Sequence, residues 1–265
     1  MKIGGICTFV MPIRIDSNER MRNVEFVLRW LQPLGAKILL LEADKEPRID
    51  SETTGGTIDY HFVKDDDPVF HRTRYINMLL RSANSEIVSV WDADIVTDYN
   101  QIEEAINSIC TGAVLSYPYN GEFIMLPRHL SDELTKSRDL GCVMNKKLVS
   151  IFNRPFCGGA FFVNRNIYMS LGGENEKFTG WGPEDAERIR RVQIMGYQIE
   201  WTKKGKAYHL YHPRNKNSCF FDKESAIEMR KELIKVCSMN REELSEYIKE
   251  MQNGRYDRLD DISVS

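Results

Sequence analysis

Residues 86–94 read EIVSVWDAD, an apolar run that ends in two carboxylates. A short apolar run bounded by polar residues is typical of a buried strand. Residues 71–82 before it and residues 102–109 after it repeat apolar side chains at helical spacing. Strand and helix therefore alternate around EIVSV, which predicts an α/β sheet that is mostly parallel in its first part.

The same alternation extends to both sides of this stretch. The other expected elements are, in chain order, a strand at 2–10, a helix at 20–31, strands at 37–41, 58–62 and 160–163, a glycine-rich loop at 172–182, a helix opened by Pro183, and strands at 199–201 and 207–211. Residues 118–157 show only weak periodicity. After Asp222, two amphipathic stripes predict two helices. We expect one main domain over 1–221 and a small helical extension over 222–265 that packs on it.

Composition excludes several classes of function. The chain has 265 residues, of which 42% are apolar, enough for a sizeable core. Its 36 basic and 39 acidic residues give a net charge of −3, without the basic footprint that nucleic-acid binding needs. No apolar run approaches the ~20 residues of a membrane span, and the N-terminus lacks the pattern of a signal peptide. Six widely spaced cysteines without a CxxC pair predict reduced thiols and a cytoplasmic location.

The first candidate for chemistry is the DxD sequence Asp92-Ala93-Asp94, which follows the EIVSV strand. Ligands of open α/β sheets bind at the carboxyl ends of strands. In extended chain, residues i and i+2 point to the same side, so both carboxylates can address one site. One would bind a divalent metal and the other the ligand that the metal carries. The same three residues also occur by chance in solvated turns.

The second candidate is GWGPED, residues 180–185. Proline followed by two acids is how many helices begin, so that part needs no functional explanation. A tryptophan between two glycines is not explained in this way. An exposed aromatic side chain on a flexible hinge suits stacking on a sugar or closing over one.

Histidine and arginine side chains supply further candidates. His209 and His212 stand three residues apart, and on a strand they would face opposite ways, so they need not share a metal. Pro213 ends the strand and leaves His212 in a loop, where a ligand role competes with a structural one. Arg72 opens a helix after Phe70, and a helix N-terminus favours anions. Arg14 follows the first strand, and its guanidinium can bind phosphate bidentately at the same edge.

Taken in order over residues 70–214, these motifs resemble the catalytic region of the β-1,4-galactosyltransferase family. They also resemble the related N-acetylgalactosamine-transferring domains of bacterial chondroitin-type polymerases. The resemblance implies a GT-A-type, Rossmann-like mixed sheet flanked by helices, which is the fold of nucleotide-diphospho-sugar transferases. It further implies an unanchored galactosyltransferase-like enzyme of surface polysaccharide biosynthesis that uses a UDP-sugar donor and a saccharide acceptor.

The resemblance also implies donor-binding roles. Phe70 and Arg72 match the stretch that contacts uridine diphosphate, and Asp92 matches the residue near the ribose. Gly158 and Gly159 match the glycine pair that lines the donor sugar. The N-terminal third matches loosely, so Arg14 is assigned to the donor edge by its position after the first strand.

Metal-binding roles follow from the same resemblance. Asp94 matches the carboxylate ligand, and His212 matches the histidine of the family's M-x-x-H motif, with His209 where the methionine would stand. His212 is therefore expected to be a stronger ligand than His209. Carboxylate and imidazole ligands together with diphosphate oxygens suit Mn²⁺, with Mg²⁺ as the alternative.

Roles toward the acceptor come from GWGPED. Trp181 matches the aromatic residue of a mobile loop, Glu184 an acceptor contact and Asp185 the catalytic base, while Pro183 replaces a glycine of the family. A single displacement with Asp185 as base would invert the anomeric configuration and give a β-linkage. The sequence does not distinguish galactose from N-acetylgalactosamine, and it identifies neither the acceptor nor the linkage.

Two other classes of function compete with this interpretation. A noncatalytic sugar-nucleotide or glycan-binding protein on the same fold would not need both Asp94 and Asp185. A metal-dependent nucleotidyltransferase would also use paired carboxylates. That enzyme would need a glycine-rich phosphate loop near the first strand, which Gly4-Gly5 does not supply, and it leaves GWGPED unexplained.

Overall fold

The computed structural model describes residues 2–50, 53, 55–150 and 155–252. Its centre is a seven-stranded sheet with the order β3-β2-β1-β4-β8-β6-β9. The bounds of these strands are β1 Cys7–Ile13, β2 Lys37–Asp44, β3 Ile58–Lys64, β4 Ile87–Trp91, β6 Leu115–Tyr117, β8 Ala160–Asn164 and β9 Ile199–Trp201.

The sheet is mixed, and its first part is parallel as the sequence predicts. β3, β2, β1 and β4 run parallel to one another, whereas β8 is antiparallel to both β4 and β6. The expected first strand at 2–10 is misplaced, because β1 spans Cys7–Ile13. The backbone N–H groups of Ile6 and Cys7 donate to the Ile3 carbonyl, and Gly5 has φ +83°, so the chain turns before it enters the sheet.

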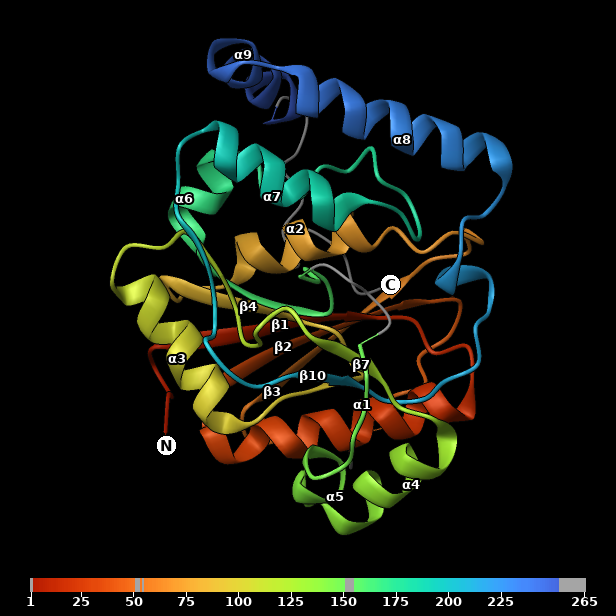
Figure 1. Cartoon of the computed structure of the whole chain (residues 1–265). Helices are drawn as coiled ribbons and strands as arrows, with labels where there is room; N and C mark the ends of the chain where they lie inside the picture. The colour runs from red at the N-terminus through yellow and green to blue at the C-terminus, as the bar shows by residue number, and fades with distance from the viewer. Residues whose placement is uncertain (1, 51–52, 54, 151–154, 253–265) are drawn as a thin grey trace.

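Helices cover both faces of the sheet, as Figure 1 shows. α1 and α3 lie on one face, α2, α6 and α7 lie on the other, and α8 and α9 lie beyond α7. The bounds are α1 Asn18–Leu31, α2 Arg72–Ser82, α3 Tyr99–Cys110, α4 Arg128–Ser137, α5 Gly141–Met144, α6 Arg165–Ser170, α7 Glu184–Ile194, α8 Lys223–Ser238 and α9 Arg241–Gln252, with 3₁₀ turns at Gln32–Leu34 and Lys216–Ser218. None of the helices in the described ranges is long and apolar enough to cross a membrane.

A second, three-stranded sheet has the order β5-β10-β7. It joins β5 (Ile95–Val96), β10 (Ala207–His209) and β7 (Phe123–Met125). β7, α4 and α5 all fall within residues 118–157, where the sequence shows little periodicity, and residues 151–154 lie outside the described part. Strands of two or three residues carry too few side chains for a period, so long-range pairing determines them.

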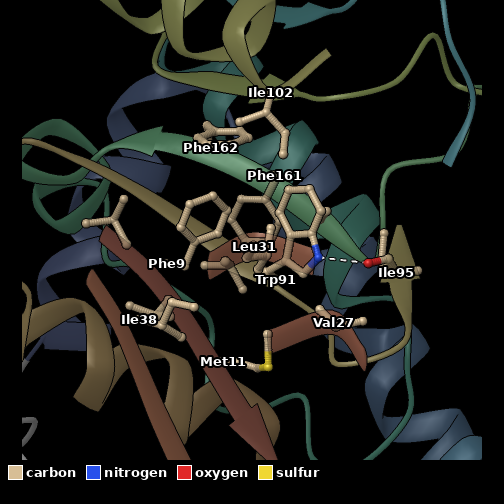
Figure 2. Packing of buried hydrophobic residues seen from close by; sticks show 14 of the residues in the cluster. Phe9, Met11, Val27, Leu31, Ile38, Trp91, Ile95, Ile102, Phe161 and Phe162 are labelled. Carbon is tan, nitrogen blue, oxygen red and sulfur yellow. Dashed lines mark hydrogen bonds between the residues drawn. The ribbon is translucent and has the colours of Figure 1, made fainter. Parts of the chain in front are cut away.

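The main core covers both faces of the seven-stranded sheet. Figure 2 shows a part of it, in which side chains of α1 and α3 pack near the Phe9, Trp91 and Phe162 rings. The Phe9 ring lies edge-to-face against Trp91, with centroids 5.5 Å apart, and against Phe162, with centroids 6.0 Å apart. The Trp91 indole N–H donates to the Ile95 carbonyl over 2.9 Å. This bond ties the chain that follows the DxD sequence to the core.

The two C-terminal helices form a smaller apolar cluster against the end of α7. Val236, Leu244, Tyr247, Ile248 and Met251 are buried there, and Ile194 packs against them. Both helices expected after Asp222 are therefore present. The division of the chain at 221/222 stays a prediction, and residues 253–265 of the expected extension lie outside the described residues.

Replacing Phe162 by Ala removes a fully buried ring from the contacts with Phe9 and Trp91. We expect the free energy of unfolding, measured with urea, to fall by about 3–5 kcal/mol. Ile227→Ala on α8 is the control, because Ile227 is 50% exposed, and its loss should be within about 0.5 kcal/mol. Equal losses for the two variants would contradict this account of the core.

Candidate functional site

One cleft at the carboxyl ends of β1 and β4 brings together every site residue predicted from the sequence. The twelve are Arg14, Phe70, Arg72, Asp92, Asp94, Gly158, Gly159, Trp181, Glu184, Asp185, His209 and His212. Other lining residues were not singled out from the sequence, among them Arg20, Asn23, Phe123, Met125, Phe156, Arg214 and Asn217. Most of these have no motif spacing that would single them out.

Asp94, His209 and His212 form a cluster whose ligand atoms all lie within 4.8 Å of one another. The distance from Asp94 Oδ2 to Nε2 is 3.5 Å for His209 and 3.2 Å for His212. The small sheet brings them together, because β10 pairs antiparallel with β5 and sets His209 opposite Ile95. The Leu210 N–H also donates to the Asp94 carbonyl over 2.7 Å.

The expectation that the two histidines face opposite ways is wrong for this chain. It assumed that strand geometry continues through both residues, but β10 ends at His209. The chain then turns, and the two imidazole centroids lie 5.0 Å apart. Both rings therefore face the same carboxylate.

The protonation of this cluster suits a divalent cation. His212 Nδ1 lies 2.8 Å from the Pro213 carbonyl, which can only accept, so this contact orients the ring and turns Nε2 toward Asp94. Burial lowers the pKa of His209 and favours the neutral, metal-binding imidazole. Burial also raises the pKa of Asp94, but His209, His212 and Arg20 outweigh it, and the net pKa lies well below its usual range.

Asp94 Oδ2 and the Nε2 atoms of both histidines face one another at short range. His209 Nδ1 is also buried and has no hydrogen-bond partner among the residues that the structure describes. One carboxylate oxygen and two imidazole nitrogens are a donor set that Mn²⁺ accepts. The residues present therefore fit a bound divalent metal ion.

On the other side of the cleft, Arg72 and Asp92 form a pair. The guanidinium donates to Asp92 Oδ1 from Nη2 over 2.6 Å and from Nε over 3.1 Å. Arg14 donates to the Ala43 carbonyl over 2.8 Å and lies over the Phe70 ring, 5.3 Å from its centroid. The protein itself thus holds both guanidinium groups in place along one wall of the cleft.

The glycine pair before β8 is explained by close packing. A Cβ atom at Gly158 would lie 2.4 Å from Asp185 Oδ2. Gly159 has φ +82°, and a Cβ there would lie 2.9 Å from the Ile95 side chain. Glycine at 158 therefore lets the Asp185 carboxylate lie directly over the backbone that lines the cleft.

Glu184 and Asp185 open α7 but have different surroundings. Asp185 Oδ1 accepts a hydrogen bond from Arg188 Nη1 over 2.7 Å. Glu184 is 8% exposed, and its Oε2 has no partner among the described residues. Burial, together with the adjacent Asp185, raises the pKa of Glu184 to about 8. At neutral pH the Glu184 carboxyl group is therefore mostly protonated.

Trp181 lies at the rim of the cleft and is 46% exposed. The glycines on both sides have structural reasons. Gly180 has φ +68°, and a Cβ at Gly182 would lie 2.6 Å from Met229 Sδ on α8. The Trp181 ring lies edge-to-face on Phe220, with centroids 4.9 Å apart.

Residues 138–213 match the family described as the N-terminal domain of galactosyltransferase. The predicted resemblance to galactosyltransferases is thereby confirmed for this segment. The segment contains the glycine pair, GWGPED and both histidines of the metal cluster. The DxD sequence and Arg72 lie outside it.

Several solved glycosyltransferases have similar structures. One is a mutant of Drosophila β-1,4-galactosyltransferase 7 in complex with manganese, UDP-Gal and xylobiose. The match covers 83% of this chain and 78% of the galactosyltransferase chain, with 17% identity and a TM-score of 0.51. The match with GalNAc-T7, solved with UDP, GalNAc and Mn²⁺, covers 96% of this chain and 53% of the GalNAc-T7 chain. Its identity is 13% and its TM-score 0.57.

Glucosyl-3-phosphoglycerate synthase from Mycobacterium tuberculosis, solved with Mn²⁺, UDP and phosphoglyceric acid, matches 89% of this chain and 80% of its own. Its identity is 15% and its TM-score 0.53. Identities this low show the fold alone. The predicted GT-A-type mixed sheet flanked by helices is therefore confirmed.

The buried Glu184 carboxyl group should make stability depend on pH. Its folded pKa of about 8 lies above the ordinary 4.5, so across this window the native state holds a proton that the unfolded chain releases. Stability from this group is therefore full below the unfolded value and is lost as pH rises through the folded pKa. As pH rises from roughly 5 to 9, we expect the melting temperature of Glu184→Gln to fall less than that of the wild type. Parallel pH profiles would contradict the assignment.

Proposed function

We propose that this chain is an inverting, metal-dependent glycosyltransferase. It transfers galactose or N-acetylgalactosamine from a UDP-sugar to a saccharide hydroxyl and forms a β-glycosidic bond. The observation that carries the proposal is that one cleft holds both the cluster of Asp94, His209 and His212 and the carboxyl group of Asp185. Similar folds that bind manganese with UDP-Gal and xylobiose, or Mn²⁺ with UDP and GalNAc, support it.

In this proposal the metal is Mn²⁺ or Mg²⁺, held by Asp94 and the two imidazoles. When bound, the cation neutralises the charge that develops on the diphosphate as it leaves. The residues on the opposite wall hold the donor. Phe70 offers an aromatic surface fixed beneath Arg14, and Arg72 holds Asp92 in one orientation for the ribose. Gly158 and Gly159 line the part of the cleft for the donor sugar, and their lack of side chains lets Asp185 and Ile95 pack directly against this backbone.

The acceptor enters on the side of α7. Its hydroxyl oxygen attacks the anomeric carbon from the face opposite the diphosphate, the bond to the diphosphate oxygen breaks, and Asp185 takes the hydroxyl proton. Glu184, protonated at neutral pH, donates a hydrogen bond to the acceptor. Trp181 stacks on the sugar at the rim of the cleft. One displacement inverts the anomeric configuration.

The place of this reaction in the cell stays a prediction from the sequence. We propose that the chain acts in the cytoplasm, in the synthesis of a surface polysaccharide, on the basis of its six cysteines and its resemblance to bacterial polymerase domains.

The Asp185→Asn variant tests the proposed base. It keeps the shape of the side chain and removes the charge that accepts a proton. With a panel of UDP-sugars, Mn²⁺ and saccharide acceptors, we expect wild-type transfer to one donor sugar and a fall in kcat of about 10²–10⁴-fold in the variant. The dissociation constant of the donor should change by less than about threefold.

Three results would contradict this assignment. Near-normal turnover of Asp185→Asn would remove Asp185 from the mechanism. An α-linked product from a UDP-α-sugar would exclude inversion. Donor binding without hydrolysis or transfer by the wild type, across the whole panel, would instead support the noncatalytic binding protein.

The Asp94→Ala variant tests the metal. It removes the carboxylate that both imidazoles face, so calorimetry should show no Mn²⁺-dependent binding of UDP. His212→Ala should weaken this binding more than His209→Ala, because the His212 ring is oriented by its bond to the Pro213 carbonyl. A reversed order would make His209 the main ligand, and wild-type binding by Asp94→Ala would refute the metal site.

A further inference from the structure

The carboxylate proposed as the base contacts an arginine with no exposed surface. Arg188, one turn after Asp185 on α7, is 0% exposed. Its Nη1 donates to Asp185 Oδ1 over 2.7 Å, while Nε and Nη2 donate to the two oxygens of Glu174 over 2.8 and 2.9 Å. The guanidinium also lies over the Phe161 ring of β8, 4.0 Å from its centroid. Its orientation is therefore determined on three sides.

Glu174, which holds the far side of Arg188, is itself fixed. It follows Gly172 and Gly173, which have φ +95° and +61°, conformations that favour glycine. Its backbone N–H donates to Asn77 Oδ1 over 2.8 Å, and its carbonyl accepts from Asn77 Nδ2 over 2.9 Å. Burial raises the pKa of Glu174, but the Arg188 charge outweighs burial and lowers it to about 2. Glu174 is thus a fixed anion that anchors the guanidinium.

Of the two acids that open α7, only Asp185 is within reach of this guanidinium among the described contacts. Arg188 binds Oδ1 of Asp185, while Oδ2 lies over Gly158 at the cleft. Glu184 has no such bond, and its Oε2 is left without a partner among the described residues. The two neighbouring carboxyl groups therefore differ in their contacts: Arg188 donates a hydrogen bond to Asp185, while Glu184 is buried without one from it among the described residues.

We propose that Arg188 is a positioning residue for glycosyl transfer: it binds one oxygen of Asp185, turns the other toward the acceptor, and sets its positive charge against this carboxylate rather than against Glu184. The inference rests on the proposed function, with Asp185 as base. Arg188 itself is buried beneath the cleft and touches no substrate. The groups that act on Asp185 are Arg72 of α2, Asp92 after β4, Tyr117 of β6, Tyr119, Glu184 and Arg188.

The chain offers a matched control on the same helix. Arg191 is also 0% exposed and pairs with Glu187, with Nε 2.8 Å from Oε1. It donates to the carbonyl of Gly173 over 2.6 Å, close to the anchor of Arg188. Neither Arg191 nor Glu187 lines the cleft. Its removal tests the effect of losing a buried ion pair from α7 without touching Asp185.

The test compares two charge-balanced double variants, Arg188→Met with Glu174→Gln and Arg191→Met with Glu187→Gln. Removing both partners avoids leaving one buried charge unpaired. For each variant, kcat and acceptor KM are measured across pH with saturating Mn²⁺ and UDP-sugar, and donor binding is measured by calorimetry. Because an opposite charge within ~4–6 Å lowers the pKa of a carboxyl group by about 1–3, loss of Arg188 should move the acidic limb of kcat upward by about 1–3 pH units.

The fall in kcat should thus be largest at low pH and should recover as pH rises, with donor affinity within about threefold of the wild type. The Arg191 variant should keep the wild-type limb. Arg188→Lys, whose single ammonium group replaces the five-donor fork, should show a smaller shift in the same direction. It also serves as the test if the Arg188 double variant does not fold.

The positioning role would be overturned if the acidic limb of the kcat–pH profile did not move in the Arg188 variants, or if it moved equally in the Arg191 control. Absence of any transfer by the wild type would instead refute the proposed function, so the two failures are distinguishable.

Discussion

The pairing of β10 with β5 is the interaction on which the site depends. β5 comes directly after the DxD sequence, and β10 belongs to a segment more than a hundred residues later. Their antiparallel register sets His209 opposite Ile95, and the Leu210 N–H then binds the Asp94 carbonyl. Without this pairing, Asp94 would be a carboxylate in a turn. With it, two imidazoles face one buried carboxylate oxygen.

The rest of the molecule holds the other wall of the cleft against this cluster. The parallel strands β1 and β4 end at the same edge, which places Arg14 and the DxD sequence side by side. The indole of Trp91 ties the turn after DxD to the core. On the opposite face of the sheet, α7 buries two arginines, each with a carboxylate partner. Buried ion pairs of this kind add little net stability, and breaking one is costly, so their clearest effect is to specify one arrangement of side chains.

Much of the fold could be predicted from the sequence, because the long elements have clear periodicity. EIVSV, the stripe at 102–109 and Pro183 before α7 each appear where they were expected. β5 and β7 could not be found in this way. β5 has only two residues, and β7 lies in the stretch of weak periodicity at 118–157, so distant partners determine both. β1 begins later than expected because a tight turn at Gly5 precedes it.

The candidate site divides in the same manner. The sequence reveals Asp92, Asp94 and GWGPED because the residues of each motif are neighbours both in the sequence and in the cleft. The joint orientation of His209 and His212 could not, because it arises where a strand ends. Arg188 was missed because an arginine three residues after an acid ordinarily indicates an exposed helical pair. The protonated state of Glu184 depends on burial, which one helical turn of sequence does not reveal.

The central claim is that the cleft holds a divalent cation between Asp94 and the imidazoles, beside a UDP-sugar. The most direct measurement is anomalous diffraction from crystals grown with Mn²⁺ and UDP. We expect one manganese peak within coordination distance of Asp94 Oδ2 and His212 Nε2, about 2.0–2.3 Å, and UDP bound beside it. A manganese peak elsewhere, or UDP bound in the cleft without manganese at these atoms, would contradict it.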